Sequence, residues 1–173
     1  MIHALQILTL LVFPALVITA ALRDVVSYTI PNWLSLALAA AFPLAALAQG
    51  LPLPALGLSL AIGATALVAG MAMFALRWIG GGDAKLFAAA AIWLGWPALT
   101  TYLAVTGLAG GGLAVMLLGL RSPMLRPYVM NGPGWFARLA GPGENVPYGL
   151  AIAIGALAAF PASTLMQGLG PAV

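Results

Sequence analysis

The chain has 173 residues, of which 64% are hydrophobic and only 5% are charged. Soluble domains carry about 25% charged residues, so this composition excludes an ordinary water-soluble protein and indicates a membrane protein. The net charge of +3, from six Lys and Arg against three Asp and Glu, is too small and too scattered for a nucleic-acid-binding surface. The chain has no cysteine, which excludes disulfides, thiolate metal sites and thiol nucleophiles.

Apolar runs separated by turn-forming residues predict an all-α polytopic membrane protein, a bundle of about six transmembrane helices in a single domain, 1–173. The first run lacks the basic start of a secretory signal and is long enough to span a bilayer. The long connection 121–145 is rich in Pro and Gly and is expected to lie at the membrane surface. Gly107 and Gly111 form a GxxxG pair, which is typical of close helix packing. The expected spans are 4–22, 33–47, 54–76, 84–94, 99–120 and 147–166, with a Gly-Trp-Pro break before the fifth.

The basic residues predict the orientation of these spans. If the helices alternate in direction, the first, third and fifth connections share one side, and every Lys and Arg lies in or beside them. Positive charge favours the cytoplasmic side of a membrane, so we expect both termini outside and the basic connections inside. The residues concerned are Arg23, Arg77, Lys85, Arg121, Arg126 and Arg138.

The acidic residues Asp24, Asp83 and Glu144 fall on the same expected side. An ionisable side chain at a membrane is costly and is therefore a candidate functional residue. Each also has a structural interpretation: Asp24 as a solvated helix end, Asp83 as a helix N-cap, and Glu144 as a loop charge. The two aspartates stand out because each belongs to a distinctive turn-forming segment, DVVSYTIPN at 24–32 and GGGDAK at 80–85.

The first and fourth helices of such a bundle can meet, which would bring Asp24 and Asp83 together. Two carboxylates that share a site do not both ionise easily, so one keeps a proton. The anionic one can take a proton from water while the other donates to a carbonyl oxygen, which hydrolyses an amide without a metal or a covalent intermediate. Because a helix N-terminus favours negative charge, we expect Asp83 to be the anionic member and Asp24 to carry the proton.

The glycines Gly80, Gly81 and Gly82 have no side chains, so a substrate backbone could lie close beside Asp83; a plain flexible turn is the alternative. A small proton- or cation-coupled transporter using the same aspartates is the alternative function. Such sites usually lie near the bilayer midplane, whereas all charge here lies at one face. A metalloprotease is not expected, because the single histidine is His3 and no His-Glu-x-x-His motif is present.

Three segments together match one family pattern. GGGDAK at 80–85 has a glycine–x–glycine–aspartate signature with a lysine two positions on, 24–32 has an aspartate followed by Ile-Pro-Asn, and PYGLAIAIGA occupies 147–156. The chain resembles, over nearly its whole length, the GxGD membrane aspartyl proteases in their type IV prepilin peptidase form. It is similar to the short Flp/Tad-type form, because it has no N-terminal domain with paired cysteines, so pilin methylation is not expected.

The resemblance implies a hydrolase that cleaves the leader from type IV prepilins or pseudopilins at the cytoplasmic face of the bacterial inner membrane. Its partners would be that substrate and the lipid bilayer, with no cofactor, metal or nucleic acid; the oligomeric state stays open. Asp24 and Asp83 would form the catalytic pair. The residues that would bind substrate or shape the site are Gly80, Gly81, Gly82, Lys85, Ile30, Pro31, Asn32, Pro147, Tyr148 and Gly149.

Overall fold

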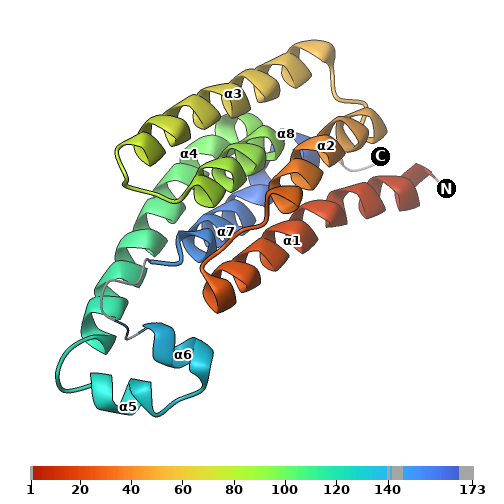
Figure 1. Ribbon diagram of the computed structural model, residues 1–173. Helices are drawn as coiled ribbons and strands as arrows, with labels where there is room; N and C mark the ends of the chain where they lie inside the picture. The colour runs from red at the N-terminus through yellow and green to blue at the C-terminus, as the bar shows by residue number, and fades with distance from the viewer. Residues whose placement is uncertain (1, 140, 142–145, 168–173) are drawn as a thin grey trace.

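The computed structural model describes residues 2–139, 141 and 146–167, and Glu144 lies outside these ranges. All regular elements within them are helices, which confirms the predicted all-α class (Figure 1). They are α1 (Ile2–Ser27), α2 (Asn32–Ala48), α3 (Leu53–Ala75), α4 (Gly81–Leu120), α5 (Arg126–Met130), α6 (Gly134–Leu139), α7 (Tyr148–Ala159), the 3-10 helix η1 (Phe160–Ala162) and α8 (Thr164–Gln167).

Four helical segments in the described part of the chain are long and apolar enough to cross a membrane. They are α1, α3, α4 and the segment Tyr148–Gln167, which joins α7, η1 and α8. The helix α2 is equally apolar but has only 17 residues. Many large apolar side chains on these helices are exposed, as Leu8 and Val68 are, which suits a surface that faces lipid. These observations support a multi-pass membrane protein but do not confirm six separate spanning helices.

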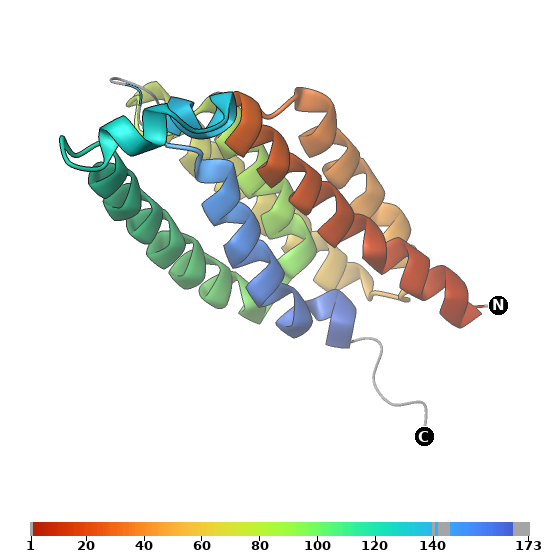
Figure 2. The ribbon, with the colours of Figure 1, turned by 90° about the horizontal axis from the view of Figure 1, so that it is seen from below.

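The fourth and fifth predicted spans form the single element α4, which folds back on itself. The backbone is not helical at Gly95 (φ 61°, ψ −163°) and Trp96 (φ −102°, ψ 133°), at the predicted Gly-Trp-Pro break. The rings of Phe87 and Tyr102 stack with their centroids 4.9 Å apart. In a straight helix their backbones would be about 22 Å apart. The element therefore has two antiparallel legs, named here leg A (81–94) and leg B (97–120), which diverge from the break in Figure 2.

Leg A forms the centre of the bundle. The alanines at 88–91 are at most 5% exposed, because other helices cover this leg on every side. A helix that is apolar all round is typically buried in this way. Small residues let α3 approach leg A closely: a Cβ added at Gly70 would lie 3.0 Å from the Cβ of Ala84. This packing holds the start of α4, which carries Asp83, in a fixed place.

Trp93 joins leg A to the first two helices. Its indole Nε1 donates a hydrogen bond of 2.7 Å to the carbonyl oxygen of Leu38 in α2. Its ring lies 5.4 Å from that of Phe13 in α1 and 6.0 Å from that of Phe42 in α2. A fully buried tryptophan with its N–H paired fills this space without leaving an unsatisfied polar group.

We expect Trp93→Phe to lower the free energy of unfolding in detergent by about 1–3 kcal/mol, because the Leu38 carbonyl loses its donor and a buried cavity is left. The matched control is Trp33→Phe, since Trp33 is 55% exposed. That change should stay within about 0.5 kcal/mol of the wild type. Equal unfolding free energies for the two variants would contradict the central position of Trp93.

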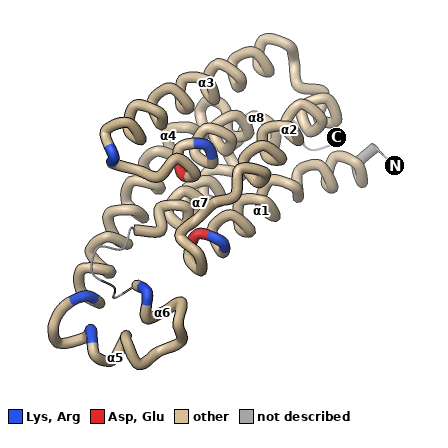
Figure 3. The backbone as a smooth tube through the Cα atoms, viewed as in Figure 1, with Lys and Arg blue, Asp and Glu red and all other residues tan. Residues whose placement is uncertain are grey.

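The charged residues of the described chain gather at one end of the bundle. Figure 3 shows them at the end of α1 and of α3, at the start of α4, and around α5 and α6. The start of α1 and α8 lie at the opposite end. The prediction that basic residues and aspartates share one side is therefore consistent with the fold.

The glycines of leg B do not pack as their spacing suggests. A Cβ at Gly107 or at Gly111 would meet no atom within 4 Å, so this GxxxG pair makes no close helix contact within the described chain. Gly110 packs instead against α7, where a Cβ would lie 3.3 Å from the ring of Tyr148. GxxxG spacing identifies a helix face, but it does not determine which face meets a neighbour.

Candidate active site

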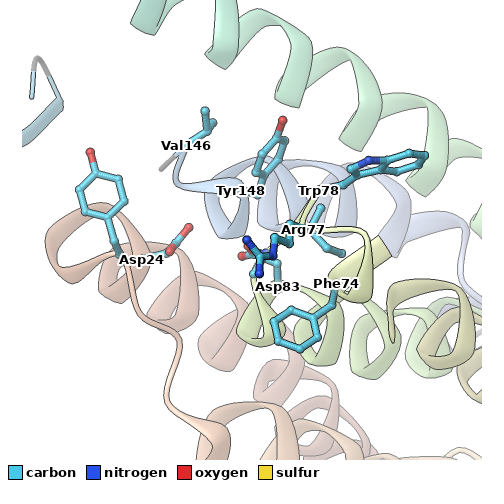
Figure 4. Close-up of a pocket in the computed structure, with 10 residues that line it drawn as sticks. Asp24, Phe74, Arg77, Trp78, Asp83, Val146 and Tyr148 are labelled. Carbon is cyan, nitrogen blue, oxygen red and sulfur yellow. The ribbon is translucent and has the colours of Figure 1, made fainter. Parts of the chain in front are cut away.

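Asp24 and Asp83 border the same cavity, which has a volume of about 240 Å³ (Figure 4). Asp24 enters it from the last part of α1 and Asp83 from the first turn of α4. Both side chains are buried, with exposed fractions of 4% and 9%. The two carboxylates are close enough for their charges to interact. The Oδ2 atom of each aspartate accepts a hydrogen bond from a backbone N–H.

Asp24 is held by the N-terminus of α7. Its Oδ2 accepts a hydrogen bond of 2.7 Å from the backbone N–H of Gly149. Gly149 is the second residue of α7, so this N–H is one of those that a helix leaves without an internal partner. A Cβ at Gly149 would lie 2.8 Å from Oδ2 of Asp24, so only glycine permits this approach. The other two predicted site residues of this segment lie next to Gly149: Pro147 is buried ahead of the helix, and Tyr148 lines the cavity.

Asp83 is held by the start of its own helix. Its Oδ2 accepts a hydrogen bond of 3.1 Å from the backbone N–H of Gly80. The N-cap residue is Gly80, and Asp83 is the third residue of α4, so its interpretation as the N-cap is wrong by three positions. The carboxylate reaches back to the N-cap, as acidic residues at this position do in capping boxes.

Both carboxylates thus lie at helix N-termini, Asp83 at that of α4 and Asp24 at that of α7. Helix N-termini stabilise negative charge. The expectation that Asp24 carries the proton was based on its place near the end of α1. That argument is incomplete, because α7 offers Asp24 the same kind of stabilisation that α4 offers Asp83; the proton assignment stays a prediction. Helix dipoles do not distinguish the two members of the pair.

Ile30 is the contact point of the three predicted motifs. It is buried, and it lies between Gly82 of the glycine run and Gly149 of α7. A Cβ at Gly82 would be 3.1 Å from the Cβ of Ile30, and one at Gly149 would be 2.8 Å from its Cδ1. Pro31 follows as the extended N-cap residue of α2. The Ile-Pro-Asn segment therefore sets the spacing between the two aspartate-bearing regions.

Gly80, Gly81 and Gly82 make room mainly for the chain itself. A Cβ would meet the Asp83 carboxylate at Gly80, the ring of Phe74 at Gly81, and Ile30 at Gly82. Of the three, Gly80 is the one that lines the cavity. The expectation that this run leaves space for a substrate backbone is therefore limited to Gly80.

Lys85 and Asn32 also connect the two motifs, but away from the cavity. The Nζ of Lys85 donates a hydrogen bond of 2.9 Å to Oδ1 of Asn32. Both side chains are exposed, and neither lines the cavity that contains the aspartates. Their contact ties the start of α2 to the first turn of leg A.

The sequence did not single out several residues that line the cavity. Among them, Tyr28 (φ 52°) and Arg77 (φ 60°) have left-handed backbone conformations that glycine or asparagine usually adopts. Arg77 ends α3 in a Schellman motif, in which the N–H of Trp78 reaches the Met73 carbonyl at 2.9 Å. Tyr28 belongs to the quoted segment 24–32 and Arg77 lies three residues before GGGDAK, but a Tyr or an Arg carries no sequence signal for a positive φ. The other lining residues that were missed are Phe74, Trp78, Ile79 and Val146.

Among the residues that the structure describes, no group of three or more His, Cys, Asp and Glu could hold a metal ion. One family model matches the chain: that of the type IV leader peptidase family, over residues 11–115. The matched range contains both aspartates and the Ile-Pro-Asn and glycine segments, and it ends before α7. No curated protein and no solved structure matches the chain.

Proposed function

Because the chain belongs to the type IV leader peptidase family, we propose that it is a membrane aspartyl endopeptidase that removes the leader peptide from type IV prepilins or pseudopilins of the Flp/Tad type. Family membership supports a protease with a protein substrate, and it gives no support to the transporter alternative. The observation that carries the proposal is the placement of Asp24 and Asp83, from distant parts of the chain, at one cavity.

The proposed reaction uses the two carboxylates on one water molecule. The ionised carboxylate takes a proton from the water, whose oxygen attacks the carbonyl carbon of the scissile peptide bond. The protonated carboxylate donates its proton to the carbonyl oxygen, which gives a neutral tetrahedral intermediate. The carboxyl group that took the proton from water then passes it to the leaving nitrogen, and the other carboxylate regains a proton from a hydroxyl of the intermediate. The carbon–nitrogen bond breaks, and a carboxyl group and an amine are released.

Two backbone N–H groups keep the carboxylates ready for this work. Gly149 and Gly80 each donate a backbone hydrogen bond to the Oδ2 of one aspartate, which fixes both carboxylates at the edge of the cavity. A water molecule occupies roughly 30 Å³, so a cavity of about 240 Å³ admits the water together with part of an extended peptide.

The proposed topology has six membrane crossings: α1, α2, α3, the two legs of α4, and the segment from α7 to α8. The reversal at Gly95 and the gathering of charge at one end support it. With the basic connections on the cytoplasmic side, both termini lie outside and the cavity opens near the cytoplasmic face of the inner membrane.

Co-expression with a candidate prepilin tests the proposal. The wild-type protein should shorten the prepilin on a gel, and sequencing of the new amino terminus should give one cleavage position after the leader. The prepilin expressed alone is the control. Equal processing with and without the protein, or no processing in either case, would contradict the proposal.

A further inference from the structure

One face of leg A carries a groove that the proposed reaction does not use. It lies between α2, α3 and leg A and has a volume of about 470 Å³. The residues that line it are all different from those that line the cavity of Asp24 and Asp83. On leg A it extends from Lys85 to Ile92, which is about 10 Å at 1.5 Å per residue. We call this space the α2–α3 groove.

The α2–α3 groove is polar at one end and apolar along the rest of its length. The polar residues of its lining are Asn32, Ser35 and Lys85. All three belong to the first five residues of α2 or of leg A, at the charged end of the bundle (Figure 3). Leu36 and Leu60 line the apolar part and are 67% and 46% exposed. An apolar channel that ends at a cation matches a ligand with an apolar chain and an anionic head.

Lys85 supplies a positive charge that the described chain does not compensate. Its Nζ donates a hydrogen bond of 2.9 Å to Oδ1 of Asn32, which is a neutral acceptor. Within the described residues, no carboxylate forms an ion pair with it. An ammonium group has three donors, so two remain for a further ligand. The side chain is exposed, and an anion can therefore reach it.

The N-terminus of α2 lies beside this charge and has no side-chain cap. Its N-cap residue is Pro31, which makes no side-chain hydrogen bond to the first turn. The first N–H groups of a helix have no partner within the helix, and they favour an anion. Asn32 is the first residue of α2 and contacts Lys85, so these N–H groups and the ammonium group lie at the same end of the groove. A phosphate group placed there would meet both.

We propose that the α2–α3 groove binds one anionic phospholipid from the membrane leaflet at the charged end of the bundle. Its phosphate lies between Lys85 and the start of α2, and one acyl chain follows leg A for about 10 Å. That depth is about two thirds of one leaflet, since the hydrocarbon core of a bilayer is about 30 Å thick. Basic pockets between transmembrane helices hold lipid headgroups in this way. A free phosphate ion would use the cation but leave the apolar length empty.

Lipid binding to the purified protein in detergent tests the polar end of the groove. Native mass spectrometry with phosphatidylglycerol would give the Kd of the first bound lipid. Lys85→Gln should raise this Kd by roughly 10-fold, because a hydrogen bond to a charged group is lost. Lys85→Arg keeps the charge and should stay within a few-fold of the wild type. Arg126→Gln is the control, since it removes an exposed cation of α5 that does not line the groove.

Two alanines of α3 test the apolar length of the groove. Ala61 and Ala64 are both exposed, and of the two only Ala64 lines the groove. Ala64→Phe should raise the Kd for phosphatidylglycerol by roughly 10-fold, because the ring occupies space that the acyl chain would fill. Ala61→Phe should bind the lipid as the wild type does.

Equal Kd values for Lys85→Gln and Arg126→Gln, or for Ala64→Phe and Ala61→Phe, would overturn the assignment. A bound lipid should also raise the melting temperature of the wild type. Phosphatidylglycerol should produce this rise and inorganic phosphate should not; an equal rise with inorganic phosphate would indicate a site for a free ion and would overturn the lipid assignment. These measurements do not involve cleavage, so their outcome is independent of the proposed function.

Discussion

Replacing either Asp24 or Asp83 by Asn is expected to slow leader cleavage by roughly 10²–10⁴-fold, the usual contribution of general acid–base catalysis. Asn has the shape of Asp but can neither take a proton from water nor donate an acidic proton. Its amide oxygen can still accept the hydrogen bond that Gly149 gives Asp24 or that Gly80 gives Asp83. The melting temperature in detergent should therefore stay close to that of the wild type. Initial cleavage rates in vesicles would give the effect.

The chain supplies its own control for this experiment. Glu144 is the one acidic residue in the sequence besides the two aspartates, so Glu144→Gln removes a carboxylate and leaves both aspartates unchanged. This variant should cleave at the wild-type rate. An Asp24→Asn or Asp83→Asn protein that remains folded and cleaves as fast as Glu144→Gln would show that the replaced aspartate is not catalytic.

Gly149→Ala should also abolish most of the activity, although it changes no chemical group. The added Cβ would lie 2.8 Å from both Oδ2 of Asp24 and Cδ1 of Ile30, closer than such atoms approach, so α7 or Asp24 must shift. A shift of this kind misplaces the carboxylate, and we expect a loss of roughly 10–100-fold in cleavage rate. The overpacking should lower the free energy of unfolding by about 1–3 kcal/mol.

Gly57→Ala is the matched control for Gly149→Ala. Gly57 lies inside α3, and a Cβ there would meet nothing within 4 Å. Alanine is favoured over glycine within a helix by about 0.5–1 kcal/mol, so this variant should be as stable as the wild type or more so. If Gly149→Ala cleaves as fast as Gly57→Ala, the contact between α7 and Asp24 does not position the carboxylate.

The sequence predicted the parts of the site that depend on short motifs. The aspartates stand out because charge is rare in this chain, and Gly95 and Pro97 mark the reversal of α4 because they disrupt a helix. The hydrogen bond between Gly149 and Asp24 spans 125 positions. Nothing in the local pattern around either residue indicates which helix N-terminus a carboxylate will meet. The helix-dipole argument for the proton assignment missed this contact, and the assignment stays a prediction.

The sequence also could not predict which residues pack against its glycines. The spacing of Gly107 and Gly111 is the same whether their face meets a helix of the same chain or remains open, and in this structure it is open. Gly81 and Gly82 suggested room for a substrate because they have no side chains. The absence of a side chain does not show which other group fills the space. The structure fills it with Phe74 and Ile30.

The central claim is that Asp24 and Asp83 act together on one water molecule, and a double-mutant cycle of cleavage rates tests it most directly. Residues that act as a unit give non-additive losses. The double variant Asp24→Asn with Asp83→Asn should therefore cleave within a few-fold of the slower single variant. A double variant whose rate falls by the product of the two single effects would show that the aspartates act independently, and would contradict the shared site.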